Sequence, residues 1–444
     1  MRFYKRVNPI LILSVFVALA ATAARAQTPS GASALPNAPA PQRSIEDLNY
    51  LGGDAAMPSF SESNIDIHSS FRQALFSKGM ALRVISQLQY AQNTIAAPVP
   101  ADQQVYVGQR AFTSAMVQPI FTADLRQLHL KHAQFYMGSV WNWASWEPAN
   151  PKAFQLWDLY LYKEFGHDRV EVKAGYTSNG LDFVGLFVGG STASGAQGVY
   201  AVLPYEVGLS YFPLTTPGLN IRINGPSHTY IKSGFERSVD PAGGPTEVQR
   251  NHTGFRFDPK GDKLFIVEEA GYQRAATATA RQMWLRAGYM HNSTPYVCFI
   301  SGRKQSGNQG AYALVDFQLR RPSHLQPAHG LYIGGSFISA SARFNAYDLY
   351  YEARIYQMAP FRSRPADQVS LVSTYTGHSH YLTDSLVAQG KSVWRNGASV
   401  TGSYSLHVHQ GQFASLGLGY IRGPAITPRV SDALTFSVNY LLFF

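Results

Sequence analysis

The sequence predicts an all-β protein, a transmembrane antiparallel β-barrel. Many segments alternate apolar and polar residues, which gives a strand one apolar face and one polar face. Charged residues make up only 14% of the chain and aromatic residues 13%, whereas soluble domains carry roughly 25% charge. Beyond the N-terminus no apolar run reaches the roughly 18 residues that a spanning helix needs. A soluble sandwich also alternates, but the number of segments and an export signal favour the barrel.

Residues 1–26 have the features of a cleaved signal peptide. Arg2, Lys5 and Arg6 form a basic start, residues 10–20 are apolar, and Ala24-Arg25-Ala26 is a small-x-small cleavage site. We therefore expect export and a position in the outer membrane of a Gram-negative bacterium.

Residues 27–68 are expected to be a Pro/Ala/Ser-rich linker followed by a segment without clear periodicity. A short helix is expected at 69–79, with Ser69 or Ser70 as its N-cap and Gly79 at its end. We expect this helix to lie on the periplasmic side, either on the surface or as a plug or brace of the barrel mouth.

Residues 80–444 are expected to form the barrel. The period of two begins at Met80, where Leu82, Val84 and Leu88 oppose Arg83 and Gln87. The same pattern recurs around 170–176, 313–320 and 348–355. A literal count of such segments gives about eighteen strands, with the least regular ones around Pro226 and Cys298.

Turn lengths predict the orientation of the barrel. Residues 166–168, 259–262 and 410–412 are predicted as tight turns, and 177–198 and 235–250 as longer connections. Short turns of such barrels face the periplasm and long loops face outside. Ser178–Gly198 then becomes the third external loop. It is unusually apolar, so we expect it to fold inward and narrow the lumen, with Asp182, Phe183, Leu186 and Phe187 as constriction candidates.

The last segment predicts the closing strand. Its apolar side chains occupy every second position: Leu434, Phe436, Val438, Tyr440, Leu442 and Phe444. A closed barrel leaves no strand edge unpaired in lipid. We expect Phe444 to serve as an insertion signal for the barrel assembly machinery.

Composition argues against several other classes of function. Lys and Arg are scattered singly, unlike the basic clusters of nucleic-acid binders, although the net charge is +10. Cys298 is the only cysteine, so no internal disulfide forms. Gly-x-Ser-x-Gly is absent, and the His pairs 378/380 and 407/409 lack a third local ligand. No catalytic residue, cofactor or metal site is expected.

Short motifs along the chain resemble the carbohydrate-selective porins of Gram-negative outer membranes, often called the glucose porin family. The resemblance runs from about Phe71 to the C-terminus, although Gln309 replaces a Trp that is frequent in the family's Gly-Asn-x-Gly motif. The segments that carry it are 107–109, 159–162, 169–175, 213–219 with 221–223, 269–272, 306–308 with Gly310 and Tyr312, and 432–434.

The resemblance implies a sixteen-stranded barrel for passive uptake of monosaccharides or small oligosaccharides. Outer-membrane lipid and lipopolysaccharide would surround it, and either a monomer or a homotrimer fits. A general or structural barrel without sugar selectivity is the alternative, and an outer-membrane hydrolase is a more distant one.

A sugar pore needs aromatic faces and charged groups that replace water around hydroxyls. The alternative is that lumen charges only pair with one another and with water. The pore-lining candidates are Arg83, Trp284, Arg286, Asp316, Asp348, Glu352 and Arg354.

Overall fold

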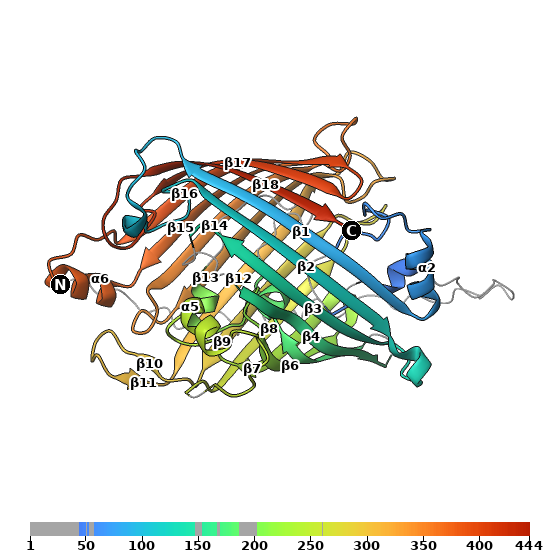
Figure 1. The fold of residues 1–444 in the computed structure, drawn as a ribbon, viewed down its shortest axis with the longest axis horizontal. Coiled ribbons are helices and arrows are strands. Elements are labelled where there is room, and N and C mark those ends of the chain that lie inside the picture. The colour runs from blue at the N-terminus through green and yellow to red at the C-terminus, as the bar shows by residue number, and fades with distance from the viewer. Residues whose placement is uncertain are drawn as a thin grey trace, which may run out of the picture.

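The computed structural model describes residues 44–49, 51–52, 57–146, 153–166, 169–185, 202–259 and 261–444. Within these residues sixteen antiparallel strands form one closed barrel in which chain neighbours pair (Figure 1). The predicted signal peptide and the predicted Pro/Ala/Ser-rich linker lie outside the described residues. The barrel strands are β1 (Met80–Asn93), β2 (Phe112–Asp124), β3 (Ala133–Ala144), β4 (Ala153–Phe165), β5 (Val170–Thr177), β6 (Thr216–Asn224), β7 (Thr229–Arg237), β8 (Leu264–Arg274), β9 (Met283–Asn292), β12 (Asn308–Arg320), β13 (Gly330–Ala340), β14 (Tyr347–Met358), β15 (Gln368–His378), β16 (Asn396–His409), β17 (Gln412–Arg422) and β18 (Ala433–Phe443).

The literal count of about eighteen strands is too high for the barrel. β10 (Tyr296–Val297) and β11 (Lys304–Gln305) pair only with each other, next to Cys298 in the connection between β9 and β12. Alternation over two residues cannot distinguish a loop hairpin from a barrel strand. The sixteen strands implied by the family resemblance are confirmed.

Alternation assigns one face of each strand to lipid and the other to the lumen. In β3, Met137, Trp141 and Trp143 are exposed on the outside, whereas Tyr136 and Val140 are buried inside. A spanning strand must satisfy its backbone groups by pairing while its outward side chains meet lipid. This pattern accounts for the apolar outer surface of the barrel.

The first and last strands close the barrel. Leu88 of β1 pairs with Tyr440 of β18, and the backbone N–H of Phe444 donates to the carbonyl of Val84 at 2.8 Å. Phe444 therefore continues the β1–β18 ladder. Its role as an insertion signal stays a prediction.

Helical segments are short and lie in the connections. None in the described part of the chain is both long and apolar enough to cross a membrane. The 3₁₀ segments are η1 (Ile45–Leu48), η2 (Ala101–Gln103), η3 (Leu125–Leu128) and η4 (Pro226–His228); the α-helices are α2 (Ser70–Ser77), α3 (Gly180–Phe183), α4 (Leu203–Val207), α5 (Gly244–Arg250) and α6 (His380–Ala388).

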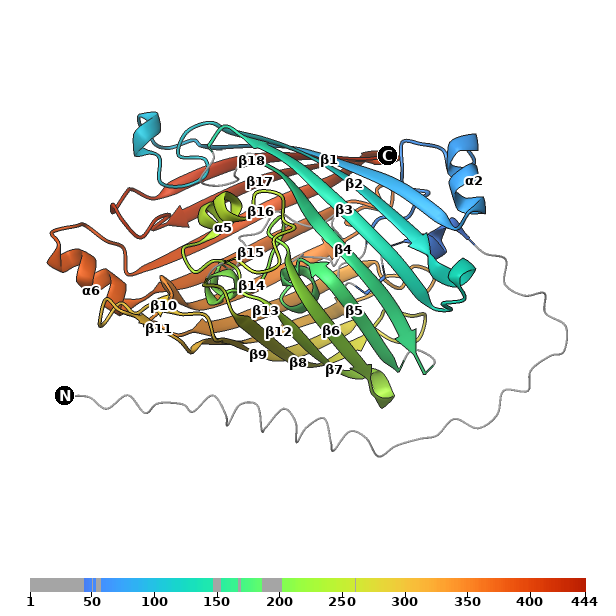
Figure 2. The same cartoon turned by 60° about the horizontal axis from the view of Figure 1, so that its bottom comes forward.

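The two ends of the barrel carry different elements (Figure 2). α2 and the C-terminus lie at one end, where the connections are mostly short, and α6 and the β10–β11 hairpin lie at the other. The prediction of a tight periplasmic turn at 259–262 was wrong. These residues belong to the long connection between β7 and β8, because α5 precedes them without a return strand.

The described part of 27–68 is the segment without clear periodicity. Residues 44–49, 51–52 and 57–64 pack against the inner wall of β1–β4 and the β16–β17 turn; we call them the N-terminal insert. Asn64 donates its backbone N–H to the carbonyl of Phe443 at 2.8 Å, and Glu62 binds the His407 ring at 2.7 Å. This segment lacks periodicity because it is held by scattered contacts rather than by one continuous face.

Candidate functional site

The third external loop enters the barrel over its described part, residues 178–185 and 202–215. The backbone N–H of Ser178 donates to Asp158 Oδ1 at 2.8 Å, and Asn179 Nδ2 donates to Glu236 Oε2 at 2.9 Å. All four residues are buried. Fixed polar contacts at the end of β5 thus turn the chain inward instead of outward.

Apolar side chains then seat the loop on the barrel wall. Phe183 and Leu203 are fully buried in one cluster with Val267 and Tyr312, whose side chains point inward from β8 and β12. Burial of a large apolar side chain contributes roughly 1.5–3 kcal/mol. The apolar character of the loop therefore attaches it to the wall.

A charged group forms where the loop meets β5, β6 and β7. Asp182 Oδ2 accepts from Lys173 Nζ at 2.8 Å and from Asn220 Nδ2 at 3.0 Å, and Lys232 Nζ donates to the backbone carbonyl of Asp182. Together with Tyr162, Glu171 and Arg222, these residues line a cavity of about 70 Å³, which we call the charged cavity. It offers cations, carboxylates and an amide within one small space.

Arg286 attaches the loop to β9. Its guanidinium donates to the carbonyls of Phe183 (3.1 Å), Val184 (3.3 Å) and Gly185 (3.1 Å), and it stacks 3.8 Å from the centre of the Trp284 ring. Hydrogen bonds from an ionised donor are stronger than neutral ones. Arg286 thus fixes the loop rather than presenting an open guanidinium to the lumen.

Glu269 of β8 connects this region to the neighbouring strands. Its carboxylate accepts from Tyr230 at 2.8 Å and from Tyr312 at 2.7 Å, and Lys232 Nζ lies 3.5 Å away. The Trp284 indole N–H donates to the Tyr230 hydroxyl at 3.1 Å. The wall beneath the loop is therefore a continuous polar network.

A second ionic cluster lies further round the barrel on β12–β14. Arg354 binds Asp316 and Glu352, each with a shortest N–O distance of 2.6 Å. Gly334 of β13 stands between the partners, because a Cβ there would lie 2.5 Å from Arg354 Nε and 2.6 Å from Asp316 Oδ1. The glycine lets the arginine cross β13 to reach Asp316.

The seven predicted lumen residues do not form one group. Trp284 and Asp316 are register partners on β9 and β12, so the structure brings Trp284, Arg286, Asp316, Glu352 and Arg354 to neighbouring inward positions. Of the loop candidates, Asp182 and Phe183 are buried, whereas Leu186 and Phe187 lie outside the described residues.

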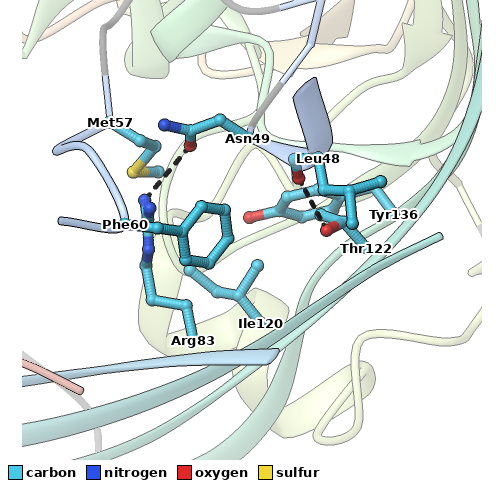
Figure 3. Close-up of a pocket in the computed structure, with 8 residues that line it drawn as sticks. All are labelled: Leu48, Asn49, Met57, Phe60, Arg83, Ile120, Thr122 and Tyr136. Atoms are coloured by element: carbon cyan, nitrogen blue, oxygen red, sulfur yellow. Dashed lines mark hydrogen bonds between the residues drawn. The ribbon is translucent and has the colours of Figure 1, made fainter. Parts of the chain in front are cut away.

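Arg83 and Asp348 depart from the group. Arg83 faces inward but is covered by the N-terminal insert, with its Nη1 3.2 Å from Asn49 Oδ1 and its guanidinium 4.2 Å from the Phe60 ring centre (Figure 3). A register shift between Tyr347 and Leu349 bulges Asp348 out of the β14 alternation, so it neighbours His378 and His380 instead of Arg354. A bulge adds one residue and changes the face that follows.

Several residues of the site were missed by sequence reasoning, namely Lys173, Asn220, Arg222, Lys232 and Glu269. Alternation already gives Glu171 and Lys173 an inward position, so a signal existed. What the sequence lacks is the pairing of β5, β6 and β7 that brings these positions to one cavity. No group of three metal-ligating side chains occurs among the described residues.

α4 docks on the opposite strands through a buried carboxyl. Glu206 Oε2 accepts from the backbone N–H of Tyr347 at 2.9 Å. Burial raises the pKa of the Glu206 carboxyl to about 7. The protonation state of this anchor therefore changes near neutral pH.

Comparisons with known proteins agree with this architecture. Two structures of Pseudomonas putida OprB, at high and low pH, match with TM-scores of 0.71 and 0.56 at 15% and 14% identity. Each match covers 87% of this chain, with 99% and 100% of the respective OprB chain. No curated protein sequence gives a significant match. The model of the carbohydrate-selective porins, OprB family, matches residues 84–442, and the chain therefore belongs to this family.

Proposed function

We propose that small sugars pass through the lumen between the charged cavity and the Arg354 cluster, exchanging water for contacts with both. The protein is an outer-membrane porin for passive, carbohydrate-selective diffusion, in keeping with its family and fold.

The charged cavity carries the proposal. Lys173, Asp182 and Arg222 offer donors and acceptors that match hydroxyl groups, and the Tyr162 ring borders the same space. Charged partners make stronger hydrogen bonds than neutral ones. A sugar hydroxyl that gives up its bound water can therefore form hydrogen bonds with these groups. An apolar solute of equal size cannot form such bonds.

Orientation and export complete the proposal. We place the α2 end in the periplasm, because the short connections gather there, and residues 1–26 serve as the cleaved signal. Sugars then enter past the third external loop and leave past the N-terminal insert, through a mouth lined by Asp124, Arg126, Lys131 and Glu164.

Sugar block of ion current in planar bilayers tests the assignment. Arg222 stacks 4.1 Å from the Tyr230 ring centre and donates to Gln273 at 2.9 Å. Arg222→Ala should weaken sugar block by about 5- to 150-fold if one charge-assisted contact of roughly 1–3 kcal/mol is lost. Arg274→Ala is the matched control, since Arg274 also stacks on a tyrosine, Tyr272, but lies at the strand end on the outward face.

Equal affinity for sugar in Arg222→Ala and in the control Arg274→Ala would exclude the charged cavity as the contact site. A barrel without sugar selectivity would instead show no block by any sugar while still conducting ions. Liposome swelling with sugars against amino acids of similar size separates these outcomes.

A further inference from the structure

Trp394 holds two arginines at the end of the barrel opposite α2. The Arg429 guanidinium lies 4.2 Å from the Trp394 ring centre, and the Arg422 guanidinium lies 5.6 Å from it. Stacking on an indole stabilises a guanidinium while leaving its N–H groups available. We call these three residues the arginine clamp.

The clamp is fixed by the backbone around it. The indole N–H of Trp394 donates to the carbonyl of Val430 at 2.9 Å, and the backbone N–H of Trp394 donates to Ile426 at 2.9 Å. The N–H of Arg429 bonds Ser392 at 3.1 Å. Two connections, 379–395 and 423–432, are thereby joined into one surface.

Neither guanidinium of the clamp pairs with a carboxylate among the described residues. The neighbouring Arg395 binds Asp384 at 2.7 Å, and Asp432 accepts from the Tyr420 hydroxyl at 2.6 Å. The nearby acids thus have other partners. Arg422 and Arg429 are both exposed, so two ordered cations are left to meet an anion.

Position identifies the kind of anion. Arg422 ends the outward row of β17, in which Leu416, Leu418 and Tyr420 are each about half exposed and alternate with buried glycines. An aromatic followed by a basic residue marks the level where hydrocarbon gives way to head groups. The clamp therefore faces the head groups of the outer leaflet, given the orientation proposed above.

We propose that the arginine clamp binds the phosphate groups of lipopolysaccharide. Arginine matches phosphate geometry with two parallel N–H donors, and two guanidiniums on one indole present a pair of such forks. This site lies outside the lumen and is independent of sugar passage.

Binding of purified lipopolysaccharide to the detergent-solubilised full chain tests the clamp. The double variant Arg422→Ala/Arg429→Ala should bind at least about tenfold more weakly, with unchanged single-channel conductance. The pair Arg422→Lys/Arg429→Lys should be intermediate, because lysine keeps the charge but loses the planar fork. Arg343→Ala is the matched control, an exposed arginine 5.9 Å from the Phe344 ring in the connection between β13 and β14.

Dephosphorylated lipopolysaccharide and inorganic phosphate separate the source of the interaction. The wild type should lose affinity for the dephosphorylated lipid, and inorganic phosphate at millimolar concentration should compete only weakly, since a single small ion lacks the lipid anchor. Equal binding of phosphorylated and dephosphorylated lipid by the wild type would overturn the proposal, even if the alanine variant failed to fold. An equal loss in Arg343→Ala would also overturn it.

Discussion

Two segments enter the barrel from opposite ends, and they are attached in different ways. The third external loop is fixed by buried ions, with Asp182 on Lys173 and the Arg286 guanidinium on three loop carbonyls. The N-terminal insert is fixed to β2 and β3 by neutral groups: Thr122 Oγ1 donates to the carbonyl of Leu48 at 2.7 Å, and Gln134 bonds the backbone on either side of residue 50. Its charged contact, between Glu62 and the His407 ring, is partly exposed to solvent.

The two segments therefore differ in the free energy needed to release them from the wall. Removing one partner of a buried charge leaves an unpaired ion, which costs several kcal/mol. Breaking a neutral hydrogen bond costs only about 0.5–1.5 kcal/mol. We infer that the third external loop constricts the lumen permanently. We also infer that the N-terminal insert is displaced from the lumen more easily than this loop.

Removing residues 44–64 should have the largest effect on ion current. The insert contacts β1–β4 from inside, so its loss empties that part of the lumen and exposes Arg83. Single-channel conductance should rise while the barrel still inserts, because strand pairing does not involve the insert. An unchanged conductance in correctly inserted protein would show that the current does not pass this region.

Arg286→Ala should have the next largest effect. It removes the donor shared by three loop carbonyls, at a cost of about 3 kcal/mol or more. The loop should loosen, so conductance should become larger and noisier, and thermal unfolding should occur at a lower temperature. Arg286→Lys is the control, because it retains the charge without the fork. Quiet, wild-type conductance in Arg286→Ala would mean that apolar packing alone holds the loop.

Gly334→Ala tests the Arg354 cluster, whose ion pairs join residues of the barrel wall and none of either segment. The added methyl group would fall between Arg354 and Asp316, so their ion pair should separate at a cost of about 1–3 kcal/mol. Sugar block should weaken with little change in conductance. Gly402→Ala on β16 is the matched control, because a Cβ there meets no atom within 4 Å. Equal sugar block in the two variants would remove the Arg354 cluster from the proposed path.

The smallest change in conductance is expected from Glu206→Gln. The folded-state pKa of about 7 lies above the ordinary 4.5, so this carboxyl favours the fold at low pH. Its contribution is complete below about pH 4.5 and is lost as pH rises through about 7. The free energy of unfolding of the wild type should therefore fall by roughly 1–3 kcal/mol as the pH rises across this window. Glu206→Gln should make the free energy of unfolding less dependent on pH, which thermal unfolding at a series of pH values measures. An identical pH profile in both proteins would assign the dependence to another group.

The alternation of apolar and polar residues predicted those features that depend on one strand alone. Met80 as the start of β1, the outward row of β18 and the inward positions of Trp284, Arg286 and Arg354 all follow from a period of two. Asp348 lies outside this pattern because a register shift changes the period there, and no local residue marks the shift. Arg83 faces inward as predicted, but the residues that cover it come from a segment with no period at all. Lys173, Arg222 and Lys232 required knowledge of strand pairing, which one sequence does not contain.

The bond between Asn64 and Phe443 bears on the order of assembly. It joins positions 379 residues apart, and contacts of such sequence separation form late because the long loop must first be closed. The site for Asn64 includes the carbonyls of Gly411 in the β16–β17 turn and of Phe443 in β18, so it exists only after β18 has come to lie beside this turn. The part of the mature chain that is made first therefore finds its final place only after the part that is made last, and occupation of this site reports that the C-terminal strands are in position.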